Sequence, residues 1–300
     1  MNIIIAINQK YIERAKSMLF SLRKNNSCDI DVYLLHKELS SDEVAELSLY
    51  LKNNCNINLH SITVDCSIFR NAPLCKWWSE EMYYRLLAFD FLPIEENRAL
   101  WLDSDIIINK NIEDFYNQPI EDEYAVVCEG CNQTGNIRLL LPESNKYFNS
   151  GVILFNFDSI RKSITTEKIF QLIEKYRDVL KMPDQDILNI LYYNNVIYAD
   201  PIKFNNETFG DHILSKKKMF EIKNLAKIIH YNGPIKPWDY TGINWADSLF
   251  WKYELKRGKF IEWVVYRVKN LPVKFKAICR EILFILISVK NKIIKRGTKT

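Results

Sequence analysis

Short apolar segments alternate with amphipathic segments through the first 64 residues of this chain. The spacing of their hydrophobic residues predicts strand, helix, strand, helix and strand in turn, at residues 2–7, 11–25, 31–35, 41–53 and 58–64. Strands that alternate with helices form βαβ units, so we predict an α/β fold with a mostly parallel sheet. Ligands of such sheets bind beyond the carboxyl ends of the strands, which is where Asn8 falls.

Two carboxylates, Asp103 and Asp105, follow an apolar strand that begins at Ala99. In a strand, residues i and i+2 lie on the same side, so one cation could be held by both with Ser104 turned away. Two oxygen ligands leave most of a coordination shell open, which suits a hard divalent ion that carries the phosphates of a substrate. The alternative is a strand end at which the acids face water or cap the next element.

Three further stretches carry polar residues that could meet a substrate. Arg85, on a helix expected over residues 79–91, either reaches a phosphate or sugar or pairs with a nearby acid. Asn149 stands in a polar turn that leads into a strand, where the backbone turns sharply or approaches a ligand. Asp184 and Gln185 begin a helix and either hydrogen-bond a sugar or only stabilise the helix start.

A last predicted strand, over residues 226–229, leads into a segment that contains His230, Gly233 and Lys236. An imidazole can complete a metal site begun by two Asp, and a lysine can neutralise a phosphate. A lone histidine at a strand end is more often structural, and that reading stays open here.

The composition is that of a globular protein with a large core. Of the 300 residues, 48% are hydrophobic, which excludes a disordered chain, and eight glycines and nine prolines exclude a fibrous design. The seven cysteines are odd in number and scattered, which favours reduced thiols over a disulfide framework. Cys128 and Cys131 form a C-x-x-C pair, but no second pair completes a zinc site, so we interpret both as ordinary buried thiols.

The basic residues are concentrated at the end of the chain. Residues 259–300 contain eleven Lys or Arg against two Glu, a net charge of +9, and since the whole chain carries +4, residues 1–258 carry −5. Apolar residues recur at helical spacing between the basic ones, as in a helix that lies on an anionic bilayer. The alternative is a helix packed on the core with a solvated basic face. Nucleic acid is not an expected partner, because the positive charge is confined to this stretch.

The location predicted from the sequence is cytoplasmic. The apolar run at residues 1–7 has no basic region before it, as a signal peptide would have. No stretch of about 18 apolar residues occurs to span a membrane as a helix. With the basic tail, this predicts peripheral association with the inner face of the plasma membrane.

Six motifs resemble, in the same order, those of glycosyltransferase family 8. This family comprises retaining nucleotide-sugar transferases and includes bacterial lipooligosaccharide galactosyltransferases, lipopolysaccharide glucosyltransferases and the glycogenins. The resemblance covers about residues 1–240. The motifs are Ile-Ala-Ile-Asn-Gln-Lys-Tyr from residue 5, Tyr-Tyr-Arg-Leu at 83–86, Leu-Asp-Ser-Asp at 102–105, Phe-Asn-Ser-Gly-Val at 148–152, Asp-Gln-Asp-Ile-Leu-Asn at 184–189 and His-Tyr-Asn-Gly-Pro-Ile-Lys-Pro-Trp at 230–238.

The resemblance implies a GT-A fold, with one Rossmann-like domain at residues 1–258 and the basic amphipathic tail at residues 259–300. It implies a Mn²⁺ site, with Mg²⁺ as the alternative ion, whose ligands are Asp103, Asp105 and His230. The residues implied to contact the UDP-sugar are Ala6, Asn8, Tyr11, Ser104, Gly233 and Lys236 on the nucleotide and diphosphate, and Arg85, Asn149, Asp184 and Gln185 around the donor sugar. Bacterial members often have Asp in place of Asn8, so pairing with uracil would use an amide here.

The function implied is transfer of galactose or glucose, with retention, from UDP-galactose or UDP-glucose to a glycan or lipid-linked acceptor, in the synthesis of lipopolysaccharide or another surface polysaccharide. Glutamine is a poor nucleophile, so front-face attack by the acceptor is favoured over double displacement and Gln185 is assigned to positioning. Two alternatives remain: a metal-dependent sugar-nucleotide hydrolase or nucleotidyltransferase, and a non-enzymatic membrane-surface protein. Donor sugar, acceptor, linkage and oligomeric state do not follow from the sequence.

Overall fold

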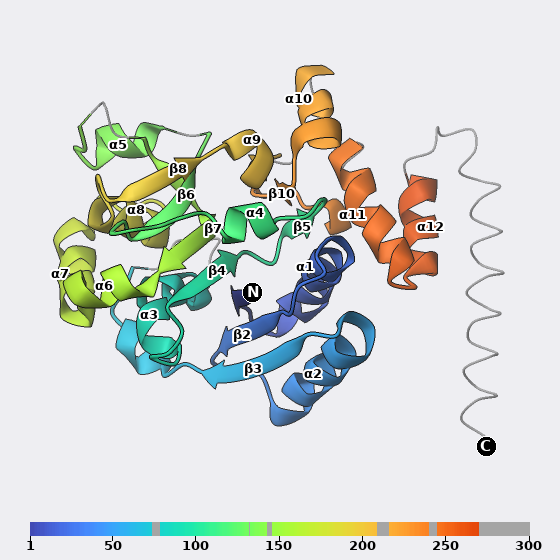
Figure 1. Ribbon diagram of the computed structural model, residues 1–300, viewed down its shortest axis with the longest axis horizontal. Helices are drawn as coiled ribbons and strands as arrows, with labels where there is room; N and C mark the ends of the chain where they lie inside the picture. The colour runs from blue at the N-terminus through green and yellow to red at the C-terminus, as the bar shows by residue number, and fades with distance from the viewer. Residues whose placement is uncertain (74–78, 132, 143–145, 209–215, 240–244, 270–300) are drawn as a thin grey trace. The chain divides into compact units, whose positions relative to one another are not determined.

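The computed structural model of the chain describes residues 1–73, 79–131, 133–142, 146–208, 216–239 and 245–269. The chain divides into two compact units, of which the first comprises residues 1–207 and 220–230 and the second comprises residues 208–219 and 231–300. Strands and helices alternate through the first unit, which confirms the predicted α/β class (Figure 1). The division predicted at residue 258 stays a prediction.

A mostly parallel sheet forms the centre of the first unit. Within the described residues it has seven strands, in the order β3, β2, β1, β4, β7, β6, β8. Their bounds, in that order, are Asn58–Thr63, Asp31–His36, Asn2–Ala6, Arg98–Leu102, Phe148–Asn156, Ala125–Glu129 and Val196–Ala199. Neighbours are parallel except that β7 runs antiparallel to β4 and β6. Because β1 and β4 are parallel neighbours, the residues that follow them, Asn8 and Asp103, lie at the same edge of the sheet.

Helices connect these strands and cover the sheet. Those of the first unit are η1 (Gln9–Tyr11), α1 (Ile12–Asn25), α2 (Ser41–Cys55), η2 (Cys66–Phe69), η3 (Glu80–Leu87), α3 (Ala88–Phe91), α4 (Glu113–Tyr116), α5 (Thr134–Arg138), α6 (Phe157–Ser163), α7 (Thr166–Tyr176), α8 (Pro183–Leu191), α9 (Pro201–Phe204) and η4 (Glu221–Leu225). The short helix α10 (Lys216–Phe220) spans the point in the sequence at which the second unit gives way to the first. The core is apolar on both faces of the sheet, since all of Ala99 to Leu102 on β4 and Val152 to Phe155 on β7 are buried.

The helix predicted over residues 79–91 is two helices in the structure. A 3₁₀-helix, η3, runs from Glu80 to Leu87, and the short α-helix α3 follows directly. Every residue from Glu81 to Leu87 is buried, so this segment has no solvated face.

A second, smaller sheet lies in the same unit. Its three described strands are in the order β5 (Ile106–Ile108), β10 (Ile228–His230) and β9 (Asn206–Glu207). β10 runs antiparallel to β5, with His230 opposite Ile106, and parallel to β9, with His230 beside Glu207. The last residue of β10 is thus next to the first residue after the Asp103 to Asp105 segment.

The described part of the second unit contains η5 (Pro237–Asp239), α11 (Trp245–Lys256) and α12 (Phe260–Lys269). The Trp251 indole donates to the Pro237 carbonyl at 3.0 Å and stacks on the Tyr266 ring at 5.1 Å, so aromatic contacts join these helices. Most of the basic tail, residues 270–300, lies outside the described residues. In the described part of the chain, no helix is both long enough and apolar enough to cross a bilayer.

Candidate functional site

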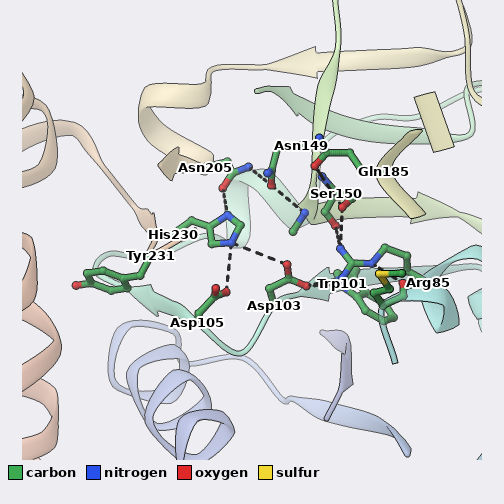
Figure 2. A network of polar contacts seen from close by, with 12 residues as sticks. Arg85, Trp101, Asp103, Asp105, Asn149, Ser150, Gln185, Asn205, His230 and Tyr231 are labelled. Carbon is green, nitrogen blue, oxygen red and sulfur yellow. Dashed lines mark hydrogen bonds and ion pairs between the residues drawn. The ribbon is translucent and has the colours of Figure 1, made fainter. Parts of the chain in front are cut away.

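Three candidate metal ligands converge at the edge where the two sheets of the first unit meet (Figure 2). His230 Nε2 is 3.2 Å from Asp105 Oδ1 and 3.9 Å from Asp103 Oδ2. Burial alone would lower the pKa of His230, but the carboxylates of Asp105 and Asp103 outweigh burial and raise it. Two carboxylates beside one imidazole form a negatively charged set of ligands, and a divalent cation would neutralise that charge.

The two carboxylates reach this point from a turn and not from a continued strand. The strand expected to run through them ends at Leu102, and β5 begins at Ile106 in the other sheet. The expected strand geometry was therefore wrong, because the chain changes sheets here. Ser104, between the two acids, is buried, while Asp103 and Asp105 are partly exposed.

The geometry of this cluster fits one divalent ion. One oxygen from each carboxylate and one imidazole nitrogen all lie within 4.8 Å of one another. An ion with ligand distances of about 2.1 Å spans such a set, and its two carboxylate ligands are of the kind that suits hard divalent ions such as Mn²⁺ or Mg²⁺. Gly151 also borders the cluster: a Cβ there would lie 2.3 Å from His230 Cε1 and 2.8 Å from Asp103 Oδ2. Glycine leaves this space to the ligands.

The orientation of the Asp103 carboxylate is set by two donors. Trp101 Nε1 donates to Asp103 Oδ1 at 2.9 Å, and Arg85 Nη2 donates to the same oxygen at 3.0 Å. The guanidinium also lies over the Trp101 ring, 4.7 Å from its centroid. With Oδ1 occupied, the second oxygen of Asp103 is the one that faces His230.

Arg85 connects the cluster to the start of α8. Its Nε lies 3.0 Å from Asp184 Oδ2, and its Nη1 donates to the carbonyl and the hydroxyl of Ser150 at 2.5 and 3.0 Å. The side chain is 7% exposed, so its nitrogens are used by protein partners. Burial raises the pKa of Asp184 although Arg85 opposes this shift. The observed contacts favour the pairing alternative for Arg85, and its contact with a sugar stays a prediction.

The other residues predicted around a sugar belong to the same network. Gln185 Oε1 accepts from the backbone N–H of Ser150 at 3.0 Å. Asn149 Oδ1 accepts from the N–H of Gly151 at 2.9 Å and from Asn205 Nδ2 at 3.0 Å. The first residues of β7 and of α8 are thereby joined, and both point polar groups toward the cluster (Figure 2).

Ala6 and Asn8 lie at the carboxyl end of β1, as predicted. The Asn8 side chain caps η1 by accepting from Lys10 N at 3.2 Å, and its amide donates to Ser79 Oγ at 3.5 Å. Tyr11 ends η1 and is 37% exposed. Their contact with a uridine stays a prediction.

Gly233 and Lys236 belong to the second unit. Lys236 Nζ donates to the Tyr231 carbonyl at 2.7 Å, and its backbone N–H donates to Asp239 Oδ2 at 3.0 Å. The predicted contact of both residues with a diphosphate stays a prediction.

Three participants were missed by the sequence reasoning. Trp101 lies two residues before Asp103, so the alternation of a strand could have placed it on the same side. Ser150 lies inside a motif that was already singled out. No pattern marks Asn205, which follows a four-residue helix.

The pair of cysteines was predicted in part. Cys128 is buried on β6, as expected, but Cys131 is exposed. Strand β6 ends at Glu129, so Cys131 falls in the following loop, where its N–H donates to Glu207 Oε2 at 3.1 Å.

Comparison with known proteins gives consistent results. A model of the family described as glycosyl transferase family 8 matches residues 2–242. Two lipopolysaccharide 1,2-glucosyltransferases, from Escherichia coli and from its strain K12, are 28% and 27% identical, over 84% and 81% of this chain and 76% and 74% of their own. A solved structure of the galactosyltransferase LgtC, in complex with donor and acceptor sugar analogs, matches with a TM-score of 0.74 and 22% identity, over 84% of this chain and 95% of that chain. The likeness to LgtC shows that the two share a fold.

Proposed function

The chain belongs to glycosyltransferase family 8, and on that premise we propose that it transfers a hexose, with retention, from a UDP-sugar to a glycan acceptor. One observation carries the proposal: Asp103 of the metal cluster is linked through Arg85 to Asp184 at the polar start of α8. A sugar nucleotide has a diphosphate next to its sugar and needs both kinds of group side by side. The fold is GT-A, shared with LgtC.

We propose Mn²⁺ as the resident ion, held by Asp103, Asp105 and His230, with Mg²⁺ as a weaker substitute. When bound, the ion neutralises the charge that the diphosphate gains as it leaves. Lys236 supplies a further positive charge to the same group. Arg85 and Trp101 keep Asp103 turned toward this position.

Front-face attack is the route that the side chains support. Asp184 is buried, and its carboxylate already accepts from Ser150 Oγ at 3.1 Å and pairs with Arg85, so it is poorly placed to act as a nucleophile. Gln185 is held by the Ser150 N–H and has little nucleophilic character. Both residues orient the donor sugar, and the acceptor hydroxyl attacks on the face that UDP leaves, with a UDP oxygen as base.

The donor is UDP-glucose or UDP-galactose, and the acceptor a glycan or lipid-linked oligosaccharide of lipopolysaccharide or another surface polysaccharide. The two E. coli relatives are named as lipopolysaccharide glucosyltransferases, which supports this class of acceptor. We further propose that residues 1–258 are the catalytic region. Residues 259–300, with a net charge of +9, bind the anionic inner face of the plasma membrane.

The test is release of UDP from a panel of UDP-hexoses, with Mn²⁺ or EDTA and with or without a glycan acceptor. Wild type should turn over one donor, faster with acceptor, and EDTA should abolish the reaction. The rate of UDP release should fall about 100-fold or more in Asp103→Asn. It should be retained in Asp114→Asn, which alters a mostly exposed acid paired with Lys227. Turnover that no acceptor accelerates would instead indicate a hydrolase, and a failure to bind any UDP-sugar with Mn²⁺ would contradict the proposal.

The tail is tested by co-sedimentation with vesicles. Binding to phosphatidylglycerol vesicles should exceed binding to phosphatidylcholine vesicles and should fall as salt is raised, because charge drives it. Equal binding to the two lipids would contradict a role for the basic residues.

A further inference from the structure

A buried asparagine, Asn205, lies between the candidate metal ligand His230 and the candidate sugar-binding residue Asn149 (Figure 2). It is 2% exposed and falls between α9 and β9. Its Oδ1 is 3.0 Å from His230 Nδ1, and its Nδ2 donates to Asn149 Oδ1 at 3.0 Å. Neither the motifs nor the roles described above include it.

The direction of each hydrogen bond in this chain follows from one backbone group. The N–H of Gly151 can only donate, so the Asn149 atom 2.9 Å from it is an acceptor oxygen. The Asn205 atom that meets the same oxygen must then be the amide nitrogen, which directs Asn205 Oδ1 toward His230. An oxygen accepts only, so His230 Nδ1 carries a proton.

We propose that Asn205 is a positioning residue, which holds His230 with Nδ1 protonated and with the Nε2 lone pair directed between Asp103 and Asp105. The proposal rests on the proposed function, because it concerns the ion that this function requires. A histidine ligand commonly donates its other N–H to a fixed acceptor, which sets both tautomer and ring orientation. Here the acceptor is itself fixed, through Asn149, by the backbone of β7.

Two substitutions separate this role from simple packing. Asn205→Leu has a similar size and removes both hydrogen bonds, so affinity for Mn²⁺ should fall about 10- to 100-fold. Asn205→Asp loses the donor to Asn149 Oδ1 but keeps an oxygen for the Nδ1–H of His230, so it should bind Mn²⁺ at least about tenfold more tightly than Asn205→Leu. The matched control is Asn206→Leu, since Asn206 is equally buried but donates to the Ile202 carbonyl at 3.0 Å instead.

The experiment measures Mn²⁺ affinity of the full chain from the electron paramagnetic resonance signal of the free ion, in the absence of donor and acceptor. Circular dichroism confirms that each variant is folded, and Asn205→Ala replaces Asn205→Leu if the latter does not fold. The proposal would be supported if Mn²⁺ affinity falls in Asn205→Leu, recovers in Asn205→Asp and does not change in Asn206→Leu.

Two outcomes would overturn it, and they differ in meaning. If wild type and a folded Asn205→Leu bind Mn²⁺ within about threefold of each other, Asn205 does not position the ligand, although the metal site stands. If wild type itself binds no Mn²⁺, the metal site of the proposed function fails and this inference fails with it.

Discussion

Gly151 occupies a position at which a side chain would displace the candidate metal ligands. Gly151→Ala would put a methyl group 2.3 Å from His230 Cε1, so the imidazole must move. We expect kcat/KM to fall about 100-fold or more, because shifts of about 1 Å at a reacting centre have effects of that size. The measurement is UDP release together with Mn²⁺ affinity.

The control for this substitution is Gly130→Ala. A Cβ at Gly130 meets Asn149 N at 3.4 Å and no described atom closer, which is ordinary contact. Its kcat/KM should match wild type. Equal losses in the two variants would show that the space beside His230 has no special importance.

Substitution of Lys236 allows the role of the lysine charge to be separated from that of the metal ion. If its charge stabilises the departing diphosphate, Lys236→Met should lower kcat/KM about 100- to 1,000-fold and leave Mn²⁺ affinity unchanged. Lys252→Met, at an exposed position of α11, serves as the control. A parallel loss of Mn²⁺ binding in Lys236→Met would argue against a direct role of the lysine in the reaction.

At the residue scale, residue types and spacing predicted the three residues of the candidate metal cluster but not the contacts that hold them in place. Asp103, Asp105 and His230 converge as expected. Each motif alone was a weak indication, but several motifs in the expected order made the prediction specific. The partners of Arg85 were not predictable, because a guanidinium can reach an acid, a carbonyl or a ligand equally well. The position of Asn205 depends on tertiary packing alone, which leaves no trace in local sequence.

At the scale of single elements, the start of α8 is fixed by a buried ion pair. Arg138 Nη1 and Nη2 each lie 2.7 Å from an oxygen of Asp186, which has no exposed surface. The same carboxylate accepts from Tyr147 Oη at 2.5 Å and from the N–H of Lys181 at 2.9 Å. Burial and the Asp186 carboxylate raise the pKa of Tyr147, so its hydroxyl stays a donor. Asp184 and Gln185 are presented from this fixed helix start.

Removal of Arg138 should therefore lower the stability of the fold. Arg138→Met leaves the buried Asp186 carboxylate without its cation, which should lower the free energy of unfolding by about 3–5 kcal/mol, as measured by urea denaturation. Arg177→Met breaks the more exposed pair with Glu174 and should lower the free energy of unfolding far less, because solvent screens that pair. Similar losses in the two variants would contradict the assignment of a structural role to the buried pair.

Element types were predictable where periodicity was strong. The alternation of strands and helices up to residue 63 matches β1 to β3, because each apolar run is short and bounded by polar turns. The segment from Glu80 to Leu87 was mistaken for an ordinary helix, since sequence does not reveal burial on every side. The turn between β4 and β5 was mistaken for strand because its flanks are apolar.

At the scale of the whole molecule, ion binding should stabilise the fold. His230 is distant in sequence from Asp103 and Asp105, so the unfolded chain lacks the complete site. Mn²⁺ at 100 times its dissociation constant should add about 2.7 kcal/mol to the free energy of unfolding, measured in urea against an EDTA control. Asp105→Asn should show no such gain, and an equal gain in both proteins would place the ion elsewhere.

The chain crosses from the large sheet to the small one at Asp103 to Asp105, and His230 returns to that crossing by pairing of β10 with β5. The candidate metal site thus depends on main-chain pairing between strands that lie far apart in the sequence. A change that separated β10 from β5 would therefore also separate His230 from Asp103 and Asp105, even if no ligand were altered.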